Sequence, residues 1–176
     1  MLSGVLLALG LALVGSVSAG GGRSSAVSQS FPLYNAGEHV DGFPLAAVLR
    51  REDTANYVSF IYGDCVAEDD AGCAPPVEIQ VWPSCHRNLG LYGGGAGALA
   101  GAPLEQIVAR GVPALIFDGG TRLELETGRA TVVVFAGTRA RLIRIVAALR
   151  ALDGTILPEH PLAQPARGRE RGAVNC

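Results

Sequence analysis

The chain has 176 residues, of which 49% are apolar and 17% are charged, and its formal net charge is −2. This is the composition of a globular protein of about one domain and not of a disordered chain. All 14 basic residues are arginines, and 16 acidic residues balance them. Binding to nucleic-acid phosphates needs a basic excess, so we expect no nucleic-acid partner.

Residues 1–22 are the least polar part of the chain, and Leu2 to Ala19 contains no charged side chain. The apolar core is shorter than the roughly 20 residues of a spanning helix, and the small residues after it are typical of a signal-peptidase site. No basic residue precedes the core, however, and extension to Gly22 gives enough length for a tilted span. We therefore predict a signal peptide or an N-terminal membrane anchor. Either one makes the protein exported, with its membrane contact through this segment.

Composition also sets the ends of the predicted domain. The Gly- and Ser-rich stretch that ends at Ser30 predicts a flexible spacer over residues 23–30. Residues 153–176 contain three prolines, and their three acidic side chains cancel three arginines. This pattern predicts a solvated, disordered tail. An extracytoplasmic domain is expected between the two, over residues 31–152.

The first half of this domain shows strand patterns. Tyr57 to Tyr62 is rich in aromatic and β-branched residues, and Val77 to Trp82 alternates apolar and polar side chains. A polar loop joins the two segments, so we expect antiparallel neighbours. Pro44 to Arg50 predicts a weaker strand. The Gly-rich residues 90–103 predict a linker or a mobile loop.

The second half predicts three more strands and a helix. Residues 113–117, 122–126 and 131–135 are separated by the turn sequences Asp118-Gly-Gly-Thr121 and Thr127-Gly-Arg129. Thr138 is a suitable N-cap for a helix with an apolar stripe. The stripe consists of Leu142, Ile145, Val146, Leu149 and Leu152. Arg141 and Arg144 lie on the other side of this helix and are interpreted as solvated, with an anionic docking face as the alternative.

The expected fold class is therefore α+β. We predict an antiparallel β-sheet of five to six strands with the C-terminal helix packed on one face. One helix leaves the second face of the sheet to be covered or used. An apolar second face would indicate a lipophilic ligand or partner.

Two blocks of sequence stand out, Tyr62-Gly-Asp-Cys65 and Gly72-Cys-Ala-Pro-Pro through Trp82-Pro-Ser-Cys85. With the surrounding strand and turn segments, they resemble an uncharacterised family of exported or membrane-anchored proteins from high-GC actinobacteria. The resemblance covers most of residues 31–152. It implies export and disulfide bonding, and it supplies no mechanism.

The cysteines of an exported chain are expected to form disulfides. Cys65 and Cys73 bracket the loop between two predicted antiparallel strands, so their Cα atoms can approach the roughly 5.5–6 Å that a bridge needs. We therefore predict this pair, with bonds from Cys85 to Cys65 or to Cys73 as the competing assignments. Cys176 is a further partner for Cys85. The cysteine spacings are wider than those of structural zinc knuckles, and no metal ligands are assigned.

No motif names a catalytic or cofactor-binding residue, and no cofactor is expected. His86 and Arg87, next to Cys85, form the candidate polar site. The predicted function is a non-catalytic extracytoplasmic binding or interaction module for an unknown protein or a small apolar ligand. The alternative is a hydrolase or other enzyme that uses the surroundings of His86.

Overall fold

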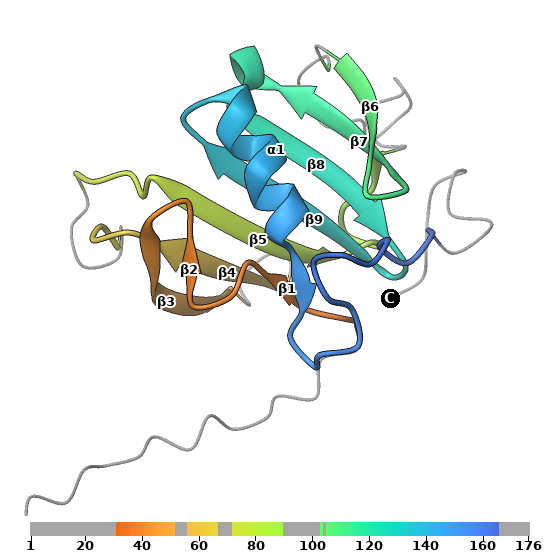
Figure 1. Cartoon of the computed structure of the whole chain (residues 1–176), viewed down its shortest axis with the longest axis horizontal. Helices are drawn as coiled ribbons and strands as arrows, with labels where there is room; N and C mark the ends of the chain where they lie inside the picture. Colours follow the sequence, from red (N-terminus) through yellow and green to blue (C-terminus); the bar gives the residue numbers. More distant parts are fainter. Residues whose placement is uncertain (1–30, 52–55, 67–71, 90–102, 104, 166–176) are drawn as a thin grey trace, which may run out of the picture.

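A computed structural model describes residues 31–51, 56–66, 72–89, 103 and 105–165 (Figure 1). The predicted signal or anchor segment, the spacer and nearly all of the Gly-rich stretch lie outside the described residues. Within the described ranges, no helix has the length and apolar character that crossing a membrane requires.

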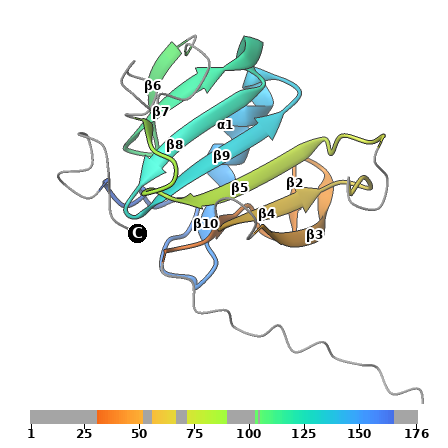
Figure 2. The same ribbon diagram turned by 180° about the vertical axis from the view of Figure 1, so that it is seen from behind.

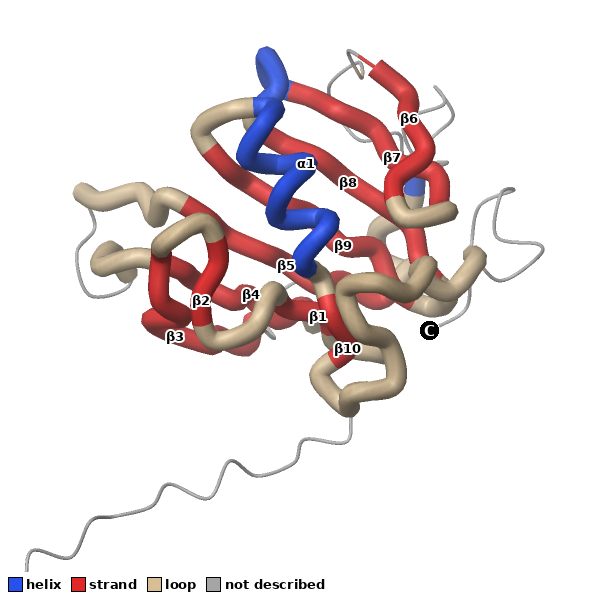
Figure 3. The backbone as a smooth tube through the Cα atoms, in the orientation of Figure 1, coloured by secondary structure: helices blue, strands red, loops and turns tan. Residues whose placement is uncertain are grey.

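Eight antiparallel strands form the main sheet, in the order β2-β3-β4-β5-β9-β8-β7-β6. A separate two-stranded pair joins β1 and β10, and helix α1 packs on one face of the main sheet (Figures 1 and 3). The elements are β1 (Tyr34–Asn35), β2 (His39–Val40), β3 (Phe43–Arg51), β4 (Tyr57–Tyr62), β5 (Val77–Pro83), β6 (Glu105–Ala109), β7 (Val112–Phe117), β8 (Arg122–Thr127), β9 (Ala130–Ala136), α1 (Arg139–Ala148) and β10 (Arg150–Ala151).

This architecture confirms the α+β class, the antiparallel sheet and the C-terminal helix, and it corrects the strand count from five to six to eight. The six segments predicted from the sequence are β3, β4, β5, β7, β8 and β9. Within the main sheet the missed strands are β2 and β6, which lie at its two edges, and the separate β1–β10 pair was also not predicted. β2 has only two residues, and β6 has too weak an alternation of apolar and polar residues to indicate a strand.

The main core lies between α1 and the sheet. Thr138 caps the helix, since its side chain accepts a hydrogen bond from the backbone N–H of Arg141 at 3.2 Å. Four residues of the predicted stripe are buried here: Leu142, Ile145, Val146 and Leu149. Leu152 was wrongly included, because the helix ends at Ala148 and the Leu152 side chain is 56% exposed.

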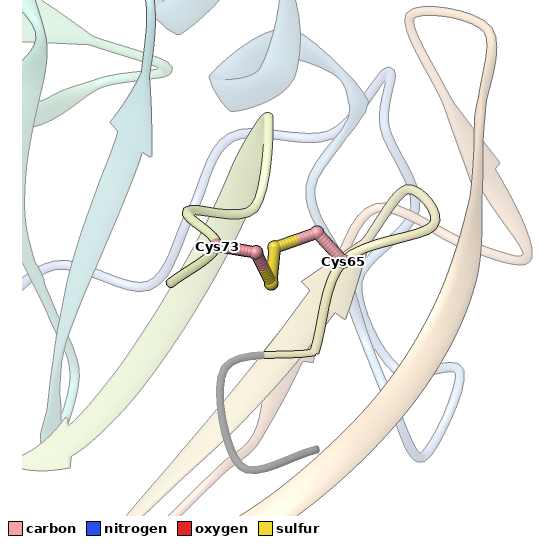
Figure 4. The surroundings of a disulfide bond; sticks show 2 residues. All are labelled: Cys65 and Cys73. Atoms are coloured by element: carbon pink, nitrogen blue, oxygen red, sulfur yellow. A yellow bond between two sulfur atoms is a disulfide. The ribbon is translucent and has the colours of Figure 1, made fainter. Parts of the chain in front are cut away.

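A disulfide closes the connection between β4 and β5, as predicted (Figure 4). Cys65 and Cys73 are bonded with a Cα–Cα distance of 5.9 Å. Gly63 precedes this bridge with a φ of +110°, and a Cβ atom there would lie 2.5 Å from Cγ of Pro76. The backbone can therefore pass this proline only because residue 63 has no side chain.

We predict that Gly63→Ala lowers the free energy of unfolding by about 3 kcal/mol, from a strained positive φ and the overlap with Pro76. Gly42→Ala is the matched control, because Gly42 has a φ of +87° and open space around it. Gly42→Ala should lower the free energy of unfolding by about 1 kcal/mol, from backbone strain alone. Urea denaturation measures both, and equal losses would contradict the close approach.

Residues 153–165, which the sequence predicted to be part of a disordered tail, pack against the domain. Leu162 is only 3% exposed, and its backbone N–H donates to the Arg110 carbonyl at 3.0 Å. The Arg110 guanidinium in turn donates to the carbonyl oxygens of Leu149, Leu157 and His160. The predicted domain boundary at Leu152 is therefore too early. The packing of this segment could not be predicted from the sequence, because a single buried apolar residue among prolines and charged residues produces no periodic pattern.

Leu162→Ala is expected to lower the free energy of unfolding by about 2–4 kcal/mol, because it empties a buried site. Leu157→Ala removes the same atoms from a side chain that is 40% exposed, and its effect should stay within about 0.5 kcal/mol. Thermal or urea unfolding distinguishes the two variants. A similar small effect for both would show that residues 153–165 contribute nothing to stability.

Candidate functional site on the second face of the sheet

The second face of the main sheet is the face opposite to α1 (Figure 2). Residues that pair across neighbouring antiparallel strands lie on the same face, so the strand register defines its rows. The first row holds Arg51, Tyr57, Trp82, Thr131 and Glu126; the second holds Leu49, Ser59, Gln80, Val133 and Glu124; the third holds Ala47, Ile61, Glu78, Phe135 and Arg122. This face combines polar and charged side chains with aromatic and aliphatic ones.

Residues 84–89 follow β5 and fold over the β8 and β9 part of the second face (Figure 2). Arg87 lies within this segment, and its Nε donates to Oε2 of Glu124 at 2.9 Å. Its Nη2 donates to Oε1 of the same carboxylate, and its backbone carbonyl accepts from the hydroxyl of Thr131. Glu124 is fully buried on β8, so this two-point ion pair fixes the segment to the sheet.

A second arginine reaches the same buried carboxylate. Nη1 of Arg122 lies 3.5 Å from Oε1 of Glu124, and its Nε lies 2.9 Å from Oδ2 of Asp118. The Arg122 guanidinium also lies over the Phe117 ring, 4.5 Å from the ring centroid. The charge on Glu124 is therefore compensated by two cations, which makes its burial tolerable.

The part of the second face over β3, β4 and β5 is only half-buried, and we call it the open patch. It consists of Leu49, Arg51, Tyr57, Glu78, Gln80 and Trp82. The Tyr57 and Trp82 rings stack with a centroid separation of 4.0 Å, and Arg87 lies 5.1 Å from the centroid of the Trp82 ring. The aromatic pair is thus held in place by the segment that covers the other half of the face.

Side-chain hydrogen bonds connect the polar members of the open patch. Trp82 Nε1 donates to Gln80 at 3.0 Å, and Gln80 donates to Oε1 of Glu78 at 2.9 Å. The Ser59 hydroxyl donates to the same oxygen. Within the described residues, Oε2 of Glu78 receives no hydrogen bond, so one carboxylate oxygen is available to an external donor.

The structure separates the roles of the residues predicted for the polar site. Arg87 is a structural side chain, whereas His86 is exposed, and within the described residues its side chain has no hydrogen bond to a carboxylate. Cys85 is disulfide-bonded. Because Cys65 and Cys73 are bonded to each other, neither competing pairing of Cys85 is formed, and Cys176, outside the described residues, is the one cysteine left in the sequence.

No sequence motif marks Tyr57, Trp82, Glu78 or Glu124 as members of a site. The alternation in β5 and β8 places Glu78 and Glu124 on one face, but only the strand order β5-β9-β8 brings them onto a common surface. A cavity of about 270 Å³ lies outside the open patch and is lined by Pro75, Pro76, Thr121, Phe135, Ala136, Gly137 and Arg141. His86 is not among the residues that line this cavity. The described residues contain no cluster of three or more side chains that could hold a metal ion.

Arg87→Met is expected to lower the free energy of unfolding by about 3 kcal/mol, because it takes one cation from a fully buried carboxylate. The double variant Arg87→Met, Glu124→Gln should recover at least about half of this loss, since it also removes the buried charge. A double-mutant cycle in urea measures the coupling. Additive losses would contradict the pairing.

Arg141 and Arg144 are both ion-paired, and the Arg144 side chain remains 57% exposed. Their Nε atoms lie 2.6 and 2.8 Å from the two carboxylate oxygens of Asp41, in the turn between β2 and β3. Hydrogen bonds from Arg144 and Arg141 lower the pKa of Asp41 from 3.8 to about 2. The ion pairs therefore join the β2–β3 hairpin to α1.

Because the folded state lowers the pKa of Asp41, its carboxylate adds stability at pH values above the unfolded pKa near 4. This contribution should be lost as the pH falls from about 4 to about 2. Asp41→Asn should lower stability at pH 7 and flatten this part of the stability curve. Urea unfolding midpoints measured at several pH values across this range check the prediction. Parallel curves of stability against pH for the wild-type protein and Asp41→Asn would contradict it.

Comparison of the chain with known protein families, with curated proteins and with solved structures finds no match in any of the three. The resemblance to an actinobacterial family of exported proteins therefore stays a prediction.

Proposed function

We propose that the chain is an exported, non-catalytic binding module that holds a protein partner on the open patch. The apolar N-terminal sequence and the disulfides support an extracytoplasmic location, because disulfides persist in oxidising compartments. The N-terminal segment is then a membrane anchor or a cleaved signal peptide.

The observation that carries the proposal is the half-exposed stack of the Tyr57 and Trp82 rings. Arg51 of β3 lies next to this stack, because it is opposite Tyr57 in the β3–β4 register. Trp, Tyr and Arg are the residues that contribute most to binding at protein interfaces. Here the rings are fixed by each other and by Arg87, so little side-chain entropy would be lost when a partner binds.

The polar groups of the open patch favour a protein over a small apolar ligand. Oε2 of Glu78 accepts no hydrogen bond within the described residues, and an apolar ligand over the open patch would bury this oxygen without a donor, which is unfavourable. A polypeptide surface supplies both apolar contact and donors for Oε2 of Glu78. The alternative of a hydrolase gains no support, because the described residues place no carboxylate within hydrogen-bond reach of His86.

The test places a photo-cross-linking phenylalanine analogue at Tyr57 of the full chain in living cells. We expect an adduct with a second protein, identified by mass spectrometry, because the analogue keeps an aromatic ring on the open patch. The matched control is the same analogue at Ile143, which is 38% exposed on α1. An alkaline phosphatase fusion after Pro165 should be active if the domain is exported.

Equal adducts from both positions, or none from Tyr57, would count against the open patch as a binding surface. An inactive fusion would count against export alone. Trp82 is the only tryptophan in the chain, so its fluorescence reports directly on occupancy of the open patch once a partner is purified.

A further inference from the structure

The cavity of about 270 Å³ lies at the end of the main sheet where β5 begins and β9 ends, since Val77 pairs with Ala136 there (Figures 1 and 2). None of its lining residues belongs to the open patch or to residues 84–89. Its volume is close to the lower end of the range of small-molecule sites, about 300–1,000 Å³. The cavity therefore suits a small ligand or the end of a peptide and not a folded partner.

The wall of the cavity is mostly apolar and is held in place. Pro75, Pro76 and the half-buried ring of Phe135 supply the carbon surface. The disulfide at Cys73 fixes the chain just before the two prolines, and Pro76 packs closely against Gly63. The cavity is therefore largely formed before a ligand binds, which lowers the free-energy cost of binding.

Of the residues that line the cavity in the described part of the chain, only Arg141 is charged. Its Nε donates to the Asp41 carboxylate at 2.6 Å, and its guanidinium carbon lies 5.2 Å from the centroid of the Phe43 ring. Within the described residues, its Nη1 and Nη2 groups make no hydrogen bond. The guanidinium is thus oriented by Asp41 and Phe43, while both terminal nitrogens keep their donors for a ligand.

The charge at this position favours an anion. Arg141 and Arg144 share the single carboxylate of Asp41, so this cluster keeps an excess of positive charge. Thr121, the other polar side chain of the lining, adds no donor, because its hydroxyl already donates to the Asp118 carbonyl at 2.8 Å. Among the lining side chains, the donors for an anion therefore come from Arg141.

Gly137 leaves the end of this guanidinium uncovered. Its φ lies outside the left-handed region, so the backbone does not require glycine here. A Cβ atom at this position would lie 3.8 Å from Nη1 of Arg141, and no other atom beyond the neighbouring residues lies within 4 Å. A larger side chain at residue 137 would therefore occupy the space next to the free donors.

We propose that this cavity binds an organic acid, with its carboxylate on Nη1 and Nη2 of Arg141 and its apolar group against the two prolines and Phe135. A guanidinium matches the two oxygens of a carboxylate. A phosphate group carries more charge and more oxygens, and it would need donors that the other lining side chains do not supply. The acid is a free small molecule or the C-terminal carboxylate of a peptide. This site is separate from the open patch and does not depend on the proposed function.

The experiment titrates the isotope-labelled full chain with two acids and follows its amide signals by NMR. The probes are 3-phenylpropanoate, a free acid, and N-acetyl-alanyl-phenylalanine, a peptide acid. We expect saturable shifts of the Gly137 amide and the Arg141 Nε–H signals, with a Kd on the order of 1 mM for the tighter acid. The corresponding amides should bind about tenfold more weakly, because they lack the negative charge. The tighter of the two acids identifies the source of the ligand.

Two arginine variants form a matched pair. Arg141→Gln should weaken binding of the tighter acid about tenfold, because it removes the cation at the cavity. Arg144→Gln is the control, since Arg144 binds the same Asp41 carboxylate but does not line the cavity, and its affinity should stay within about twofold of wild type. Gly137→Leu should also weaken binding about tenfold or more, although Arg141 keeps its charge. Urea unfolding checks that the variants fold.

Absence of saturable binding of both acids, amides that bind as tightly as the acids, or equal losses in Arg141→Gln and Arg144→Gln would overturn the proposal. Unchanged affinity in Gly137→Leu would overturn the placement of the carboxylate. Inorganic phosphate that binds as tightly as the acids would overturn the ligand class, because phosphate cannot use the apolar wall. The comparison of acid and amide uses the wild-type sequence alone, so it stays decisive if a variant fails to fold.

Discussion

A sheet of eight strands has two large faces, and one helix of ten residues cannot cover both. At about 1.5 Å per residue, α1 is about 15 Å long, whereas eight strands at about 4.8 Å spacing span more than about 30 Å. The rest of the structure follows from this shortage of covering surface. Residues 153–165 extend the cover beside the helix, and residues 84–89 cover part of the second face. The open patch is the part of the second face that the described residues leave half-buried.

Polar interactions hold the segment that covers part of the second face. A buried ion pair between Arg87 and Glu124 contributes little net stability compared with an apolar contact of the same size, but it accepts only one arrangement of the segment. We interpret it as a specificity device that fixes residues 84–89 in a single position. The same arginine lies beside the Trp82 ring, so the covered and open halves of the face are linked through one side chain.

Much of the fold could be predicted from the sequence because the central strands and the helix are strongly patterned. Val77, Ile79 and Val81 alternate along β5, and Leu142, Ile145 and Val146 recur at helical spacing, as burial demands. The edge strand β6 and the packed residues 153–165 escaped prediction, because they are stabilised by pairing with distant segments and not by local pattern. The candidate site was missed for the same reason, since Trp82 and Glu124 come onto one face only through the strand order β5-β9-β8.

The β1–β10 pair has a mechanical consequence. Tyr34 pairs with Ala151, Asn35 pairs with Arg150, and the Tyr62 hydroxyl binds the backbone of Ala36 and Gly37. Tension applied through the chain before Phe31 would first load these few hydrogen bonds. We expect them to break before the long ladders of the main sheet, because they are few. Residues 31–37 would thus detach before the main sheet is disturbed, and the open patch would keep its shape under load.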